Sequence, residues 1–240
     1  MRGGVLTLFF ILFLIPYARA QTYCPDIKDF TPSIKVFLTA PEPDFDFSKT
    51  KKELSKDTEK VSREWAKNEE QRVWIERGFT AGLARGGTGF RWRARNIGKR
   101  YGGYGSHYFC PFFNNIEIEI FYGATLFVVS DFKQESCDFR RTLAHEFQHH
   151  DINLAIAEKY VARLQKDLPS MLLQVEHYGY VPHDKLAARF ELMRASLADA
   201  VDIYMEEMHK EMTVENAKID TLENYKFESQ SCAADRRRGL

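Results

Sequence analysis

The sequence lacks the features that would place the chain among fibrous, repetitive or disordered proteins. Among its 240 residues there is no internal repeat and no low-complexity tract. Beyond the first twenty residues, no apolar run approaches the length of about 20 residues that crosses a bilayer. The chain is 44% hydrophobic, 14% aromatic and 28% charged, which is enough apolar surface to bury a core. This composition predicts one globular domain of ordinary size.

An apolar leader occupies the start of the chain. Arg2 supplies a positive charge, residues 5–16 are an almost unbroken apolar run, and Ala18 and Ala20 are the small residues that a signal peptidase requires. A run of about 12 residues spans only about 18 Å as a helix, which is too short for a membrane anchor in a core of about 30 Å. We therefore expect residues 1–20 to be a signal peptide and residues 21–240 to be a single domain, periplasmic or secreted and not membrane-spanning.

The charge is balanced, with 34 basic and 34 acidic side chains. Loss of Arg2 and Arg19 with the leader leaves a net charge of −2, so no specific nucleic-acid partner is expected. One local exception is the Gly-rich region 85–100, which holds six basic residues and no acidic one. It suits either a charged edge strand that resists aggregation or a non-catalytic exported binding module for an anionic polymer.

Four cysteines are present, and none of them stands in a C-x-x-C pair, so thiolate zinc binding is disfavoured. An even number in an exported chain predicts two disulfide bonds. Residues 115–121 alternate between apolar and polar, residues 122–125 can turn, and residues 126–130 can return as a second strand. A hairpin that turns at Gly123 and Ala124 would place Cys110 opposite Cys137. That arrangement leaves Cys24 to pair with Cys232.

The segment 145–149 reads His-Glu-x-x-His. Residues four apart lie above one another on a helix, so His145 and His149 can present two imidazole nitrogens to one metal ion. Glu146 is turned by about 100° from His145 and can reach a reacting water without binding the metal itself. The surrounding residues predict a helix that begins near Asp138 and stops at Pro169.

The remaining patterns indicate an α+β fold. We expect strands at residues 33–39 and 90–95 and the hairpin of residues 115–130, joined in a mixed or antiparallel sheet. A polar helix follows Ser48, and a second long helix runs from about residue 183 to 216 with an apolar stripe along it. The sheet should pack against the two long helices.

The His145–His149 segment resembles the zincin metallopeptidases. The next residues, from His150 to Ile152, are similar to predicted secreted bacterial zinc-dependent proteases. The resemblance implies a zincin-like fold, Zn²⁺ bound by His145 and His149, Glu146 as general base, and a protein or peptide substrate held extended on a strand beside the helix. The implied activity is that of a metalloendopeptidase. The chain departs from the metzincin pattern, because Ile152 and Ala155 stand where that pattern requires Gly and a third His.

A third protein ligand is needed for a catalytic zinc site. Glu158 lies about 13 Å beyond His149 on the same helix, out of reach of the ion unless the helix breaks. On the second long helix, Glu211 falls close to the centre of the apolar stripe, where a carboxylate needs a partner or a metal. We therefore expect Glu211 to be the third ligand, with Glu207 in reserve. The alternative is that the stripe simply emerges into solvent near its end.

Two non-enzymatic interpretations remain open at this stage. In one, the His-Glu-x-x-His segment is accidental and the basic region 85–100 carries the function. In the other, the charged helices form a docking face for a partner protein. The first predicts binding that depends steeply on salt and no bound zinc. The second predicts that Glu146→Gln leaves the phenotype unchanged.

Overall fold

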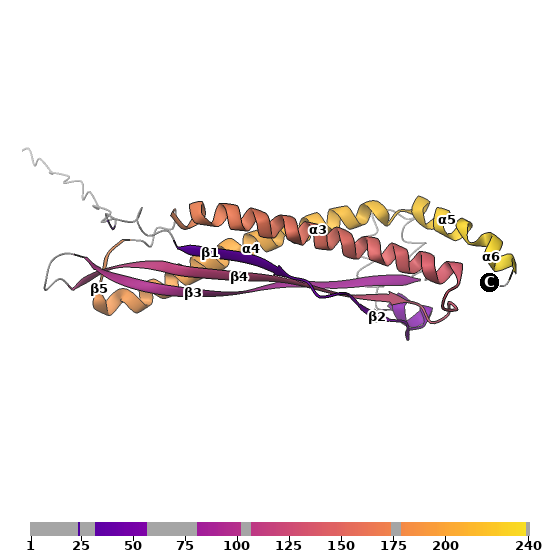
Figure 1. The fold of residues 1–240 in the computed structure, drawn as a ribbon, viewed down its shortest axis with the longest axis horizontal. Coiled ribbons are helices and arrows are strands. Elements are labelled where there is room, and N and C mark those ends of the chain that lie inside the picture. The colour runs from indigo at the N-terminus through magenta and orange to yellow at the C-terminus, as the bar shows by residue number, and fades with distance from the viewer. Residues whose placement is uncertain (1–23, 25–31, 57–80, 102–106, 174–178, 239–240) are drawn as a thin grey trace, which may run out of the picture.

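The body of the protein is a long, narrow sheet with two long helices packed against it. The structure is a computed structural model, and it describes residue 24 and residues 32–56, 81–101, 107–173 and 179–238. The helices lie side by side along the sheet, and the short last helix lies near the first turn of the first long one (Figure 1). This arrangement confirms the expected α+β architecture.

Strand β4, Tyr108–Val128, is the centre of the sheet. The strands β1, Ser33–Thr39, and β2, Asp44–Asp46, pair with it in parallel. The strands β3, Gly82–Tyr101, and β5, Val181–Pro182, pair with it antiparallel. The five-stranded sheet thus contains pairings of both senses. The expected strand at residues 33–39 is confirmed, and the one at 90–95 is part of the longer β3.

The hairpin expected at residues 115–130 is wrong, because β4 continues without a turn. Gly123 lies in mid-strand opposite Gly87 of β3. Every second side chain of the strand stays buried through the region of the expected turn: Ile116, Ile118, Ile120, Tyr122, Ala124, Leu126 and Val128. A turn would break this alternation and expose half of these side chains. The uninterrupted period of two is therefore the stronger signal.

The expected disulfide pairing is wrong for the same reason. Cys24 is bonded to Cys110, and Cys137 is bonded to Cys232. In a continuous strand, the 18 residues from Cys110 to Val128 cover about 60 Å. Cys110 and Cys137 therefore lie towards opposite ends of the sheet. The prediction of two disulfide bonds is confirmed, and each bond joins segments that lie at the same end of the molecule.

Two long antiparallel helices cover one face of the sheet. Helix α3, Cys137–Leu173, begins where expected but runs through Pro169. The short 3₁₀ turn η2, His183–Lys185, leads into α4, Leu186–Ile219. The short helices α5, Leu222–Ser231, and α6, Ala233–Arg238, follow. Contacts from Tyr204 to Asp167 and from Asn216 to His149 set the register of α4 against α3.

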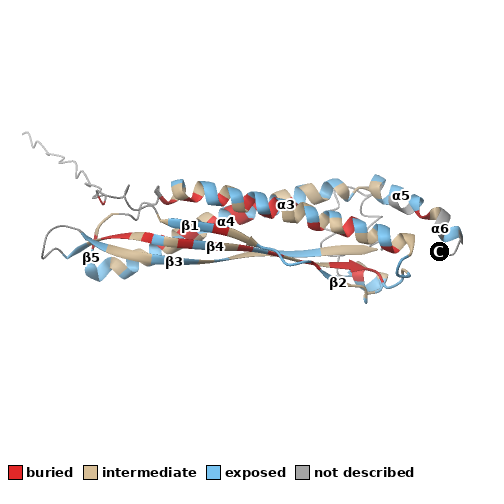
Figure 2. Cartoon of the chain, in the orientation of Figure 1, coloured by how far each residue is buried: buried red, intermediate tan, exposed pale blue. Residues whose placement is uncertain are grey.

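The main core lies between the sheet and these two helices. Buried side chains line the facing surfaces of β4, α3 and α4, as the red bands in Figure 2 show. Phe90 and Trp92 of β3 pack against the same core, whereas Arg91 and Arg93 point to solvent. The alternation of aromatic and basic residues in β3 therefore separates a core face from a charged face.

Some expected segments lie outside the described residues. These are the leader 1–20 and most of the polar helix after Ser48, of which residues 51–56 are helical. In the ranges that the structure covers, no helix is both long enough and apolar enough to cross a membrane.

Candidate metal centre

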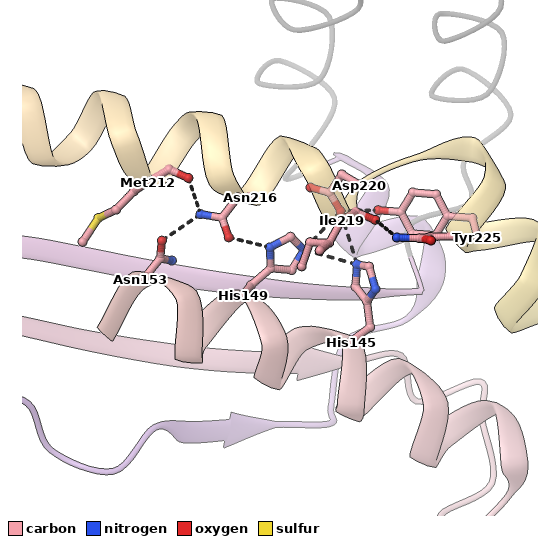
Figure 3. A network of polar contacts seen from close by, with 9 residues as sticks. His145, His149, Asn153, Met212, Asn216, Ile219, Asp220 and Tyr225 are labelled. Atoms are coloured by element: carbon pink, nitrogen blue, oxygen red, sulfur yellow. Dashed lines mark hydrogen bonds and ion pairs between the residues drawn. The ribbon is translucent and has the colours of Figure 1, made fainter. Parts of the chain in front are cut away.

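Three potential metal ligands converge at the end of α4. His145 and His149 of α3 both direct Nε2 towards Asp220, the residue directly after α4 (Figure 3). The two Nε2 atoms lie 3.2 Å apart, and Oδ1 of Asp220 lies 3.2 Å from His145 and 3.1 Å from His149. The His145 side chain is only 4% exposed, and that of Asp220 is 42% exposed. The triangle of donors therefore lies at the surface but is anchored in the core.

The separations between these donors fit a single zinc ion. Zinc binds imidazole nitrogen at about 2.0–2.1 Å and carboxylate oxygen at about 2.0–2.2 Å, usually in a tetrahedron. Two ligands of such a tetrahedron lie about 3.3–3.5 Å apart. The observed separations of 3.1–3.2 Å are within a few tenths of an ångström of this value. Three protein ligands with one open position are also the arrangement of catalytic zinc sites.

The structure does not bring Glu211 or Glu207 to the histidines. Glu211 accepts hydrogen bonds from Lys159 at 2.6 Å and from the Tyr160 hydroxyl at 3.2 Å. Tyr160 lies eleven residues beyond His149, or about 16 Å along α3. Glu207 lies further still and pairs with Arg163 at 3.1 Å. The antiparallel register therefore sets both carboxylates too far along the helix pair to share an ion with His149.

Asp220 was not among the residues expected from the sequence. It follows the last residue of α4, and Thr221 then caps α5 by accepting a hydrogen bond from the Asn224 backbone N–H at 3.2 Å. A Thr in this position is a recognisable helix start, so the boundary between α4 and α5 could have been located. Nothing in that pattern marks the preceding carboxylate as a ligand, because its role depends on what α3 places opposite.

Asn216 orients His149 through the ring nitrogen that does not face Asp220. Its Nδ2 donates to the Asn153 side-chain oxygen and to the Met212 carbonyl, both at 2.7 Å. These two acceptors fix the orientation of the amide, so its Oδ1 must accept from Nδ1–H of His149 at 2.8 Å. The proton of neutral His149 is therefore held on Nδ1, and Nε2 carries the lone pair that a metal ion needs.

The electrostatics of the ligands favour a cation between them. Burial opposes ionisation of Asp220, but hydrogen bonds from His145 and His149 outweigh it and hold the pKa of this carboxyl well below its usual range. Burial also opposes protonation of His149, yet its contacts with Asp220 and Asn216 raise the pKa of the imidazole. The site thus attracts positive charge, which a proton or a metal ion can supply.

Glu146 is buried beside the three ligands and faces the start of β3. Its carboxylate accepts a hydrogen bond from the Ala84 backbone N–H, and it is only 5% exposed. Burial raises the pKa of Glu146 to about 7, against the opposite effect of His145 and His149. A Cβ atom at Gly82 would collide with Oε1 of Glu146, so only glycine allows this close approach. A carboxyl group of this pKa can both accept and return a proton near neutral pH.

The neighbouring His150 does not belong to this cluster. It is buried on the sheet side of α3, where its Nδ1 lies 3.3 Å from the Tyr122 hydroxyl and its ring stacks on that tyrosine. The arginines of the basic region 85–100 also lie apart from the three ligands, because they project from the charged face of β3. Arg91 forms a bidentate ion pair with Glu119 of β4, which neutralises part of the positive charge of that region.

The comparisons with known proteins add no relative to this picture. Searches against protein-family profiles, curated proteins and solved structures find no match to the chain.

Proposed function

We propose that this protein is an exported zinc-dependent hydrolase, and most specifically a metalloendopeptidase. In this proposal His145, His149 and Asp220 bind the zinc ion and Glu146 is the general base. The observation that carries the proposal is the triangle of three donors with 3.1–3.2 Å sides beside a buried carboxylate. The zincin-like character of the fold is part of the same proposal.

The chemistry divides between the ion and the chain. Zinc bound at this site supplies Lewis-acid polarisation of a carbonyl group and acidifies coordinated water. Glu146 then accepts the proton of the attacking water and delivers it to the leaving nitrogen. Its environment suits both halves of this task, because burial raises the pKa of Glu146 to about 7. The hydrogen bond from Ala84 keeps the carboxylate in place between the two transfers.

A peptide is the substrate that the neighbouring strand favours. The backbone N–H of Ala84 donates to Glu146 and not to β4. The edge of β3 that is turned away from β4 therefore faces the site. The following residues, Gly86 and Gly87, are exposed and have no side chains to obstruct an approaching chain. Within the described ranges, β3 pairs with β4 alone. An extended peptide can add to such an edge through backbone hydrogen bonds and present its carbonyl groups to Glu146.

Export is supported by the cysteines. The two disulfide bonds Cys24–Cys110 and Cys137–Cys232 are typical of proteins in oxidising compartments. We therefore propose a periplasmic or secreted location for the mature chain.

The test compares wild type with Glu146→Gln on a library of quenched fluorescent peptides, each with and without a chelator. We expect wild type to contain one zinc per chain and to lose activity on chelation. Glu146→Gln should keep its zinc and lose about 10²- to 10⁴-fold in hydrolysis, the usual contribution of a general base. Glu158→Gln, an exposed position on the same helix, is the matched control and should keep full activity.

Three results would contradict the proposal. They are elemental analysis that finds no stoichiometric metal or a different metal, hydrolysis that survives chelation, and full activity in Glu146→Gln. Salt-sensitive binding to an anionic polymer without bound zinc would instead support a non-catalytic role for the region 85–100.

A further inference from the structure

The last two helices form an arm that runs from the metal centre to the beginning of α3. This C-terminal arm, residues 221–238, contains α5 and α6 and begins directly after Asp220. Asp220 itself lies outside regular helix, with φ −79° and ψ 57°. His145 and His149, by contrast, are held within the long helix α3. Of the three ligands, Asp220 is therefore the one whose position depends most on the segment that follows it.

Tyr225 of the arm contacts two of the three ligands. Its hydroxyl donates a hydrogen bond of 2.6 Å to Oδ1 of Asp220, the same oxygen that faces both histidines. Its ring lies against the His145 ring with 5.4 Å between centroids (Figure 3). One side chain thus fixes the rotation of the carboxylate and packs on an imidazole.

The arm is fastened to the beginning of α3. Cys232, just after α5, is fully buried and is bonded to Cys137, the first residue of α3. Arg236 of α6 lies 3.3 Å from the carboxylate of Asp138. Cys137 is eight residues, or about 12 Å, before His145 on the same helix. The arm therefore contacts α3 at two places, the disulfide at its first turn and Tyr225 at the metal centre.

We propose that Tyr225 is a positioning residue for the metal centre and that the Cys137–Cys232 bond holds it there. This inference rests on the proposed function only in requiring that the site bind zinc. Affinity for zinc then depends on a disulfide bond that contributes no ligand. Without the bond the arm can leave α3, and Asp220 loses the hydrogen bond that orients it.

The first test measures the dissociation constant for Zn²⁺ in Tyr225→Phe by competition with a chromophoric chelator. This change keeps the ring against His145 and removes only the hydroxyl. We expect zinc binding to weaken about 10- to 100-fold, as for other groups that orient a ligand. The visible absorption of the Co²⁺-substituted protein should also change, because it reports the geometry of the ligands. Tyr108→Phe, at the first residue of β4 where this strand pairs with β5, should change neither quantity.

The second test uses the other disulfide as its control. The bonds Cys24–Cys110 and Cys137–Cys232 close loops of similar length, with sequence separations of 86 and 95 residues. Removing either bond should therefore have a similar effect on the entropy of the unfolded chain. We expect Cys137→Ser/Cys232→Ser to weaken zinc binding at least 10-fold, and Cys24→Ser/Cys110→Ser to leave it unchanged. Circular dichroism identifies the temperatures at which each variant keeps its helices.

The outcomes separate this inference from the proposed function. If wild type binds zinc and Tyr225→Phe and both serine pairs bind it equally well, the arm has no positioning role and the zinc site stands. Equal weakening by the two serine pairs, with no effect of Tyr225→Phe, would show a general loss of stability and would also overturn the inference. A wild-type chain that binds no zinc would refute both proposals. Tyr225→Phe decides the matter if a serine pair does not fold.

Discussion

Replacing Asp220 by alanine should remove zinc from the protein without unfolding it. Oδ1 of Asp220 is one of three donors, and among the described residues no other carboxylate joins the two histidines within metal-binding distance. Glu211 is paired with Lys159 instead. Zinc sites with four protein ligands bind with about 10–16 kcal/mol, or about 2.5–4 kcal/mol per ligand. Loss of one ligand should therefore weaken binding about 10²- to 10³-fold. The quantity to measure is the dissociation constant by chelator competition, checked by elemental analysis.

Glu211→Ala is the informative control, because the sequence pattern singles out that residue. It should bind zinc like wild type and lower the free energy of unfolding by roughly 1–2 kcal/mol, since it breaks a partly exposed ion pair with Lys159 and the hydrogen bond from the Tyr160 hydroxyl. Asp220→Asn keeps the size of the side chain and should give an intermediate affinity. Wild-type affinity in Asp220→Ala, or a loss in Glu211→Ala as large as predicted for Asp220, would refute the ligand assignment.

Two further predictions concern the residues around the ligands. Asn216→Ala frees the imidazole of His149 from its acceptor, so zinc affinity measured by chelator competition should fall about 10- to 100-fold. The exposed Thr213→Ala on the same helix should leave it unchanged, and equal affinities in both variants would contradict the role of Asn216. Gly82→Ala pushes the start of β3 against Glu146, so peptide hydrolysis should fall about 100-fold while zinc content stays at the wild-type level. Gly123→Ala, on β4, where an added Cβ has nothing within 4 Å, should be fully active; similar rates in the two glycine variants would argue against this role of Gly82.

The short-range features of the site followed from the sequence. His145, Glu146 and His149 lie on one helix, and helical geometry relates residues four apart whatever surrounds them. The beginning of α3 near Asp138 and the strand at residues 33–39 were likewise visible as local patterns. The period of two in β4 was visible as well, but Gly123 and Ala124 suggested a turn that the structure does not contain.

The long-range features could not be obtained in this way. A helical projection gives the angle of Glu211 around the axis of α4, but not its position along that axis relative to His149 of α3. That axial position depends on how α4 packs against α3 and on the residues that connect the two helices. The pairing of the cysteines had the same difficulty, because it depends on whether β4 turns or continues.

The sequence by itself thus determined a helix with two histidines and a glutamate in a fixed local arrangement, because neighbours along a helix are related by the backbone alone. Only the tertiary structure decided that Asp220 completes the triangle, that Asn216 and Tyr225 orient two of its members, and that Cys137 is joined to Cys232. The contacts of α3 with Asn216, Asp220 and Cys232 link residues 67 to 95 positions apart in the chain. Their geometry follows from the packing of whole helices and strands, which no short pattern encodes.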